Sequence, residues 1–178
     1  PVVMKIVSPD ILHKSDLGLV RVGVGSVAEA KKAYAEMTAI AAKAAPKARI
    51  DGVLVSEMVT GGVETVVGVS HDDLFGPTVM FGLGGVFVEV LKDVTFRVPP
   101  FDKAEARRMI EELKGFPMLT GARGREKANL NAITDVIMKV QRLAVDHADT
   151  IAELDINPLV VGRKGAVALD ALVVARSV

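Results

Sequence analysis

The sequence predicts a mixed α/β protein built from two lobes, each a β-sheet with flanking helices. Three observations carry this prediction. Half of the 178 residues are apolar and a quarter are charged, which is typical of a folded globular chain. Short runs rich in valine and isoleucine alternate with longer amphipathic segments. Finally, Gly61-Gly62 interrupts the chain after a β-β-α-β pattern, so we expect lobes at residues 1–60 and 61–178.

The first lobe is predicted to hold three strands and one helix. Ser26 followed by Glu29 is a capping box, which marks the start of a helix. An apolar strand begins at Pro1 with no polar lead, and termini usually lie at the surface of a domain. We therefore expect an excised fragment with an incomplete first lobe. The predicted elements are strand 1–7, polar loop 10–18, strand 19–24, helix 27–43 and strand 51–59.

The second lobe is predicted to be richer in strands and to carry two helices. Asp102 is a good N-cap for the first helix, and an amphipathic pattern marks the second. The sequence closes with a hairpin. The predicted elements are strands 63–70 and 78–81, a flexible glycine loop 82–85, strands 86–90 and 94–98, helix 103–113, an irregular stretch 114–127, helix 130–147, and strands 151–161 and 166–174.

Composition excludes several classes of function. The 22 basic and 22 acidic side chains balance, so there is no long-range attraction to nucleic acid or to an anionic membrane. No apolar stretch reaches the roughly 18 residues needed to span a bilayer. With no cysteine there is no disulfide, thiol nucleophile or thiolate metal site. We expect a cytoplasmic protein that binds neither nucleic acid nor membrane.

The closing hairpin predicts a group of oxygen ligands. A turn at Gly162-Arg163-Lys164-Gly165 pairs Asn157 with Asp170, and paired residues point to the same face of a sheet. Asp155 lies on that face too, two positions before Asn157. Such oxygens can share one Mg²⁺, which keeps waters and phosphates as its other ligands. A surface polar pair, with Asn157 starting a turn before Pro158, explains the pattern equally well.

Two features near the N-terminus suggest phosphate chemistry. Lys5 interrupts an apolar strand, which indicates either an edge position or a side chain aimed at an anion. The adjacent loop adds cationic and hydroxyl donors at Ser8, Lys14 and Ser15. His13 lies beside Lys14, whose charge would keep the imidazole neutral and nucleophilic. Most loop histidines nevertheless have no such role, and the edge explanation is favoured for Lys5 taken alone.

The remaining candidates are weaker by themselves. The run Gly82-Leu83-Gly84-Gly85 lacks the spacing of a Walker or dinucleotide-binding loop and could simply turn the chain. Arg123 lies between glycines, as an exposed turn or as a mobile phosphate clamp. Glu57 and Glu64 lie in apolar strands near the junction of the lobes, where small molecules often bind. Exposed strand positions are the alternative for both acids.

Taken together, these segments resemble the ATP-grasp domain of ADP-forming acyl-CoA synthetases. The resemblance runs through nearly the whole chain, in several blocks that occur in order. The blocks are Lys5-Ile6-Val7-Ser8-Pro9-Asp10-Ile11-Leu12-His13-Lys14-Ser15-Asp16, Gly62-Val63-Glu64, Phe75-Gly76-Pro77, Met80-Phe81-Gly82-Leu83-Gly84-Gly85, Glu89-Val90-Leu91-Lys92-Asp93, Gly121-Ala122-Arg123-Gly124 and Glu153-Leu154-Asp155-Ile156-Asn157-Pro158-Leu159.

The resemblance implies an ATP-grasp fold of two mixed-sheet lobes and an acid–thiol ligase that uses ATP or ADP with Mg²⁺. Acyl-CoA, ADP and phosphate would exchange with a carboxylic acid, CoA and ATP through a phosphohistidine. The implied site comprises catalytic His13, as a second phosphate carrier, and Arg123, as a clamp; nucleotide-binding Lys5, Glu57, Val59 and Glu64; and the metal ligands Asn157, Asp170 and Asp155.

The resemblance also implies a partner. A CoA-binding domain or alpha subunit would carry the primary phosphohistidine and bring the acyl-CoA or carboxylate substrate, in an intact enzyme that is an oligomer. The fragment alone would then be inactive. Two alternatives remain: a catalytically silent, regulatory ATP-grasp domain fused to a protein lysine acetyltransferase, and an interaction domain that binds no nucleotide.

Overall fold

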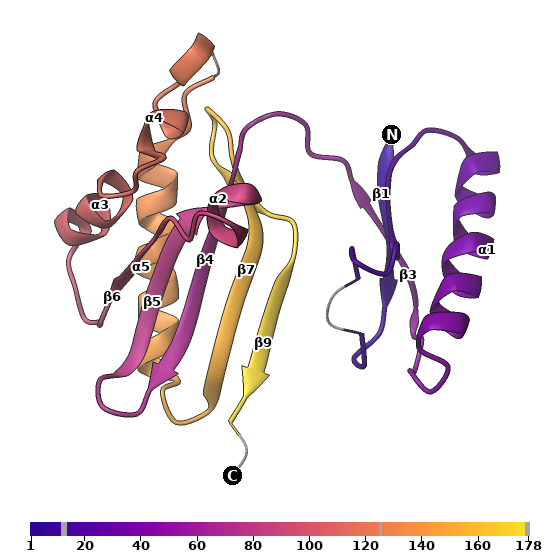
Figure 1. Ribbon diagram of the computed structural model, residues 1–178, viewed down its shortest axis with the longest axis horizontal. Coiled ribbons are helices and arrows are strands. Elements are labelled where there is room, and N and C mark those ends of the chain that lie inside the picture. The colour runs from indigo at the N-terminus through magenta and orange to yellow at the C-terminus, as the bar shows by residue number, and fades with distance from the viewer. Residues whose placement is uncertain (12–13, 125, 177–178) are drawn as a thin grey trace. The chain divides into compact units, whose positions relative to one another are not determined.

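The computed structural model describes residues 1–11, 14–124 and 126–176. The chain forms two compact units, Pro1–Thr60, called unit 1 below, and Gly61–Val178, called unit 2. Each unit has its own cluster of buried apolar side chains. Figure 1 labels the helices and strands of both.

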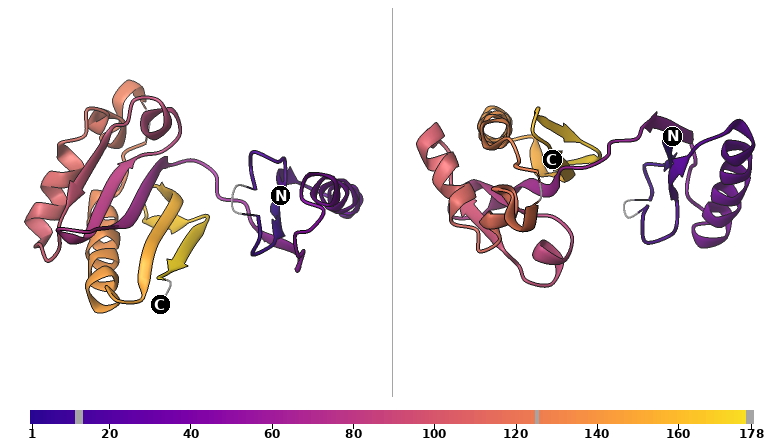
Figure 2. Two further views of the ribbon diagram at one scale, coloured as in Figure 1. Left: turned by 60° about the horizontal axis from the view of Figure 1, so that its bottom comes forward. Right: turned by 90° about the horizontal axis from the view of Figure 1, so that it is seen from above.

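Unit 1 is a three-stranded antiparallel sheet with one helix. Its strands β1 (Val2–Val7), β2 (Val20–Val24) and β3 (Gly52–Glu57) lie in the order β2-β1-β3. Helix α1 (Val27–Ala44) packs along one face, as Figures 1 and 2 show, and closes a core around Met4, Ile6, Leu19, Val24, Ala33, Met37 and Ala41.

The predicted start of α1 is confirmed. The Ser26 hydroxyl accepts a hydrogen bond from the backbone N–H of Glu29 at 3.2 Å. The Glu29 carboxylate accepts from the N–H of Gly25 at 2.7 Å, one residue before its expected partner. Both bonds satisfy donors that the start of a helix would otherwise leave without partners.

Unit 2 is a larger antiparallel sheet with helices. Strands β6, β5, β4, β7 and β8 follow one another across it, and β9 pairs with β7 as well. The elements are β4 (Val63–Asp72), β5 (Gly76–Leu83), α2 (Val86–Glu89), β6 (Val94–Arg97), α3 (Lys103–Glu111), α4 (Phe116–Leu119), a 3₁₀ turn (Ala122–Gly124), α5 (Leu130–Asp146), β7 (Ile151–Val161), β8 (Ala166–Ala168) and β9 (Ala171–Ala175).

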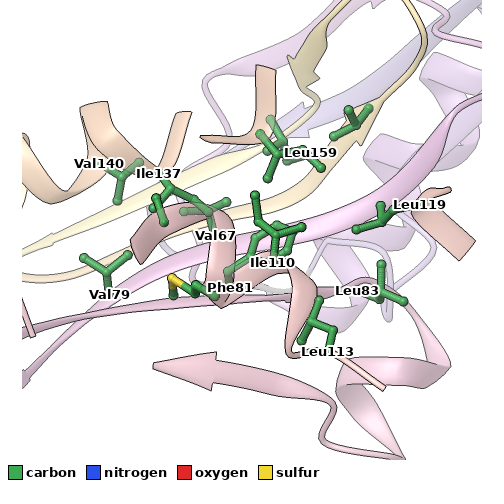
Figure 3. Packing of buried hydrophobic residues seen from close by; sticks show 14 of the residues in the cluster. Val67, Val79, Phe81, Leu83, Ile110, Leu113, Leu119, Ile137, Val140 and Leu159 are labelled. Atoms are coloured by element: carbon green, nitrogen blue, oxygen red, sulfur yellow. The ribbon is translucent and has the colours of Figure 1, made fainter. Parts of the chain in front are cut away.

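The core of unit 2 lies between its sheet and helices α3 and α5. Phe81 and Val67 on the sheet are fully buried against Ile110 of α3 and Ile137 of α5 (Figure 3). Because the side chains of a strand alternate between faces, Asp155 and Asn157 lie on the other face from Leu154 and Ile156, which belong to this core. The polar residues of the closing hairpin therefore stay outside it.

The mixed α/β class is confirmed, but some details of the prediction are wrong. All strand pairs of the described residues are antiparallel, so the sheets are not mixed; each strand is joined to its neighbours by hairpins or by longer returns. The predicted strand 86–90 is helix α2, since a short apolar run does not distinguish the two structures. Gly82 and Leu83 belong to β5 rather than to a loop.

Two further boundaries differ from the prediction. The stretch 114–127 contains α4 and the 3₁₀ turn, so it is less irregular than expected. The last predicted strand is divided into β8 and β9, with Leu169 and Asp170 between them. No helix of the described residues is long and apolar enough to cross a membrane.

Candidate functional site

The closing hairpin, which comprises β7 with β8 and β9, has the predicted register. Leu159 pairs with Ala168 and Ile156 pairs with Ala171, which sets Asn157 opposite Asp170. The backbone N–H of Asn157 donates to the carbonyl oxygen of Asp170 at 3.2 Å. The predicted pairing is therefore confirmed, and it holds across the gap between β8 and β9.

Three oxygen-bearing side chains meet on one face of this hairpin. Asp155 lies two residues before Asn157 and accepts a hydrogen bond from the Asn157 side chain. Burial raises the pKa of Asp155, and the charge of Asp170 raises it further, against the lowering effect of the bond from Asn157. We call Asp155, Asn157 and Asp170 the oxygen cluster; its two carboxylates are close enough to repel each other.

The chemistry of the oxygen cluster fits a hard divalent cation. Two carboxylates and an amide oxygen are ligands that Mg²⁺ accepts, and Mg²⁺ usually keeps waters and substrate phosphates in its other positions. Within the described ranges, no group of three or more His, Cys, Asp or Glu could hold a metal ion. The cluster thus suits a cation that arrives with a phosphate ligand better than one caged by protein alone.

Lys5 lies on the central strand of unit 1, so the edge explanation is wrong for the described sheet. It pairs with Val20 on β2 and with Leu54 on β3, and its side chain is half-buried. The sequence could not show that this strand is central, because the order of strands in a sheet depends on which segments pair, and β3 lies far from β1 in the chain. The alternative, a lysine aimed at an anion, remains a prediction.

The loop after β1 is anchored at both of its described ends. Ser8 is buried, and its hydroxyl accepts from the N–H of Asp10 at 3.2 Å. The Asp10 carboxylate accepts from the backbone N–H of Arg49 at 2.7 Å. At the other end, the N–H of Leu19 donates to the Lys14 carbonyl at 2.9 Å. Ser8 therefore has a structural role, while His13 lies outside the described residues.

The three predicted contacts to a nucleotide base or ribose are divided between the units. Glu57 is exposed at the end of β3, and Val59 follows it half-buried in unit 1. Glu64 is exposed on β4 of unit 2, where it pairs with Val160 of β7. Among the described residues, neither the Glu57 nor the Glu64 side chain makes a hydrogen bond or an ion pair that would give it a structural role.

The structure adds a contact that the sequence did not reveal. The N–H of Gly84 donates to the carbonyl oxygen of Glu64 at 2.8 Å. A Cβ on Gly84 would lie only 3.0 Å from the Cβ of Glu64. A side chain at this position would press on Glu64, so glycine is favoured at Gly84, where the chain that follows β5 lies directly against the strand that carries Glu64.

Arg123 lies in the 3₁₀ turn, and its side chain is outside the described residues. Gly121 and Gly124 on either side of it have positive φ angles of 91° and 76°.

Sequence reasoning missed Asp93, a buried carboxylate that accepts from the N–H groups of Lys114 and Gly115 at 2.9 and 2.7 Å. Asp93 thereby fixes the start of α4, the helix that leads to Arg123.

A groove of about 500 Å³ runs along α5 and lies apart from all these residues. It is lined by Pro100, Asp135, Met138, Lys139, Gln141, Arg142, Val145 and Asp146. None of the predicted site residues lines it, so it lends no support to the predicted chemistry.

Comparisons with known proteins give consistent results. A family model for the ATP-grasp domain matches residues 1–175. The beta subunit of acetate–CoA ligase (ADP-forming) II from Pyrococcus furiosus is 48% identical over 178 residues, which cover 99% of this chain and 75% of the subunit. The acetate–CoA ligase (ADP-forming) I of Archaeoglobus fulgidus is 46% identical over 170 residues, which cover 96% of this chain and 24% of that ligase.

Solved structures of acetyl-coenzyme A synthetase 1 from Ca. Korarchaeum cryptofilum have a similar fold. Its complex with CoA, Ca-AMPCP and HgCl⁺ matches with a TM-score of 0.95 at 46% identity, covering 99% of this chain and 76% of that one. Its complex with CoA and Mg-AMPPCP matches with a TM-score of 0.84 at 43% identity, with the same shares covered. In the latter, the phosphohistidine segment points towards the nucleotide binding site.

Proposed function

The chain belongs to the ATP-grasp family, among the ADP-forming acyl-CoA synthetases, and we propose that it is the nucleotide-binding module of such an enzyme. The reaction is the exchange of acyl-CoA, ADP and phosphate for a carboxylic acid, CoA and ATP. The oxygen cluster carries this proposal, because it brings together the three residues for which the sequence resemblance implies a metal-binding role.

The oxygen cluster would hold the metal of a metal–nucleotide complex. Mg²⁺, when bound, neutralises charge on the phosphate oxygens. Asn157 and Asp170 would supply ligands from facing strands, and Asp155 would orient the Asn157 amide through the hydrogen bond between their side chains. A cation also removes the repulsion between the two carboxylates, so the cluster is more favourable with metal than without it.

The remaining roles are assigned from residue chemistry. Lys5 would bind a nucleotide phosphate as a point charge. Glu57, Val59 and Glu64 would contact the nucleoside. Arg123 would stabilise the phosphoryl group in transfer, and its flanking glycines give its backbone a freedom that other residues lack.

His13 would carry the phosphoryl group between the nucleotide and a partner. When ATP is the donor, an imidazole nitrogen of His13 attacks the γ-phosphorus; the new N–P bond forms as the bond to the bridging oxygen breaks, and ADP leaves with that oxygen. The partner would be a CoA-binding domain or alpha subunit with a phosphohistidine of its own. Two findings support this division of roles: the Pyrococcus furiosus relative is named a beta subunit, and the phosphohistidine segment of the Korarchaeum structure points towards the nucleotide binding site.

The relatives reported above are named as ligases or synthetases, so they favour the enzyme module over a silent regulatory domain. We further propose that the intact enzyme is an oligomer and that it acts in the cytoplasm. This chain spans only part of the Pyrococcus furiosus subunit and of the Archaeoglobus fulgidus ligase. We therefore expect that it does not complete the reaction without the CoA-binding partner.

Calorimetric titration with ADP tests the proposal, first with excess Mg²⁺ and then with EDTA. The proposed function predicts that Mg²⁺ strengthens binding at least about tenfold, or about 1.4 kcal/mol. Absence of ADP binding under both conditions would contradict it. In the complete enzyme, labelled ATP should leave acid-labile phosphate that is lost in His13→Ala and retained in His147→Ala, because His147 is only the C-cap of α5.

A further inference from the structure

The strand that carries Asn157 has one residue too many for its partner. On β4 the register advances from Thr65 to Val67, while on β7 it passes from Leu159 to Ile156. Asn157 and Pro158 therefore stand opposite a single residue of β4. This is a β-bulge, a device that redirects a side chain and that is common beside functional sites.

The bulge is fixed on its outer side by backbone hydrogen bonds. The N–H of Asn157 donates to the Asp170 carbonyl at 3.2 Å, and the N–H of Leu169 donates to the Pro158 carbonyl at 2.9 Å. On the inner side, towards β4, the regular ladder is interrupted. The ladder resumes where Thr65 pairs with Leu159, so a contact from Thr65 can hold the chain that leaves the bulge.

Thr65 supplies that contact. Its side chain is fully buried, and its hydroxyl donates to the carbonyl oxygen of Leu159 at 2.8 Å. The neighbouring residues on the same face, Val63 and Val67, pack into the apolar core. A hydroxyl in such surroundings is costly unless it is hydrogen-bonded. Its one described partner is the carbonyl just after the bulge.

We propose that Thr65 is a positioning residue for the oxygen cluster: its bond to Leu159 holds the bulge at Asn157 and Pro158, so that Leu159 returns to the core face while Asn157 keeps the face that it shares with Asp155. A shift of the bulge by one residue towards Ile156 would turn the Asn157 side chain to the core face. The proposal deepens the proposed function and rests on it for the metal, although the bulge itself does not depend on any ligand.

Matched variants separate this role from ordinary packing. Thr65→Val removes the hydroxyl and keeps the shape, whereas Thr65→Ser keeps the hydroxyl. Thr134→Val is the control, because Thr134 is also buried in unit 2 and donates to a carbonyl, that of Leu130, at 2.9 Å within α5. Both valine variants should lose some thermal stability, so stability alone does not decide.

The first measurement is the ratio of ADP affinities with Mg²⁺ and with EDTA, by calorimetry. We expect Thr65→Val to reduce this ratio about tenfold, as loss of a residue that orients a metal ligand does. Thr65→Ser and Thr134→Val should keep the ratio of the unaltered protein. An unchanged ratio in Thr65→Val would overturn the proposal.

The second measurement needs no ligand. NMR-detected hydrogen exchange at the Asn157 and Leu169 amides should be about tenfold faster in Thr65→Val than in Thr134→Val. Equal exchange in the two variants would overturn the proposal even if ADP binding changed. If the unaltered protein binds no ADP, the proposed function fails, and the exchange rates still decide whether Thr65 fixes the bulge.

Discussion

Asn157 and Asp170 face each other across the closing hairpin, joined by the bond from the Asn157 N–H to the Asp170 carbonyl at 3.2 Å. Their side chains share a face with Asp155, whose pKa is raised mainly by burial and also by the Asp170 charge. The hairpin thus places the half-buried carboxylate of Asp155 close to the exposed carboxylate of Asp170. Cation binding and the stability of unit 2 should therefore be linked.

The first prediction concerns Asp170→Ala. Removing one metal ligand should lower the Mg²⁺-dependent part of ADP affinity at least about tenfold, measured by calorimetry with and without EDTA. Without Mg²⁺ the melting temperature should change little, because loss of the repulsion on Asp155 offsets loss of the hydrogen bond that the Asp170 carboxylate accepts from the Ala171 N–H at 3.1 Å. Asp73→Ala removes an exposed carboxylate from the β4–β5 turn of the same unit and should leave the affinity unchanged.

Lys5→Gln should weaken the binding of nucleotide phosphates. A hydrogen bond to a charged group contributes about 1.5–3 kcal/mol, so ADP affinity should fall about tenfold or more. AMP, which carries fewer phosphate groups, should be less affected. Lys47→Gln is the control, since Lys47 is an exposed lysine of the same unit. Equal ADP affinities for the two variants would remove Lys5 from the site.

Glu105→Gln should reduce stability in a pH-dependent manner. The hydrogen bond from Arg97, at 2.6 Å, and a second from Arg108 lower the pKa of Glu105 in the folded state. A lowered pKa stabilises the fold above the usual glutamate range, and this contribution is lost as pH falls through the folded-state pKa. The melting temperature of the variant should be lower at pH 7 and converge with that of the unaltered protein in acid.

The control for that series is Glu111→Gln. Glu111 pairs with Arg107 one helical turn away on the surface of α3, an arrangement that contributes little to stability. Its melting temperature should stay close to that of the unaltered protein at both pH values. A difference for Glu105→Gln that persists in acid would show that lost packing, not charge, causes the effect.

Gly84→Ala should destabilise unit 2. The new methyl group would lie 3.0 Å from the Cβ of Glu64 and 3.2 Å from its carbonyl atoms, and backbone cannot move aside as a side-chain end can. We expect a loss of about 1–3 kcal/mol in urea unfolding. At Gly165 a methyl group would meet no described atom within 4 Å, so Gly165→Ala should change stability by less than about 0.5 kcal/mol.

The sequence was informative where one local rule decides the geometry. A single turn at Gly162–Gly165 sets the register of the closing hairpin, so the pairing of Asn157 with Asp170 could be predicted. The cap at Ser26 was equally local. The candidate phosphate residues were singled out by their chemistry and given roles by a family resemblance, and the structure leaves those roles as predictions.

What the sequence could not show depends on contacts between distant segments. Lys5 was placed by its two strand partners, which begin 15 and 47 positions away in the chain, at Val20 and Gly52. The bulge at Asn157 became visible only through its register with β4. The helix α2 was mistaken for a strand because four or five apolar residues fit either structure.

The turn that begins at Gly162 and ends at Gly165 also determines which sequence changes the closing hairpin can accept. Its N–H to carbonyl bond of 2.9 Å closes the loop without help from the Arg163 or Lys164 side chains, so point changes at these two residues should be tolerated. Insertions are different: an added residue that shifted the pairing of the two strands would move Asn157 away from Asp170, whereas one accommodated within the loop would leave the register unchanged. We therefore expect functional variants with a longer loop to keep the pairing of Asn157 with Asp170.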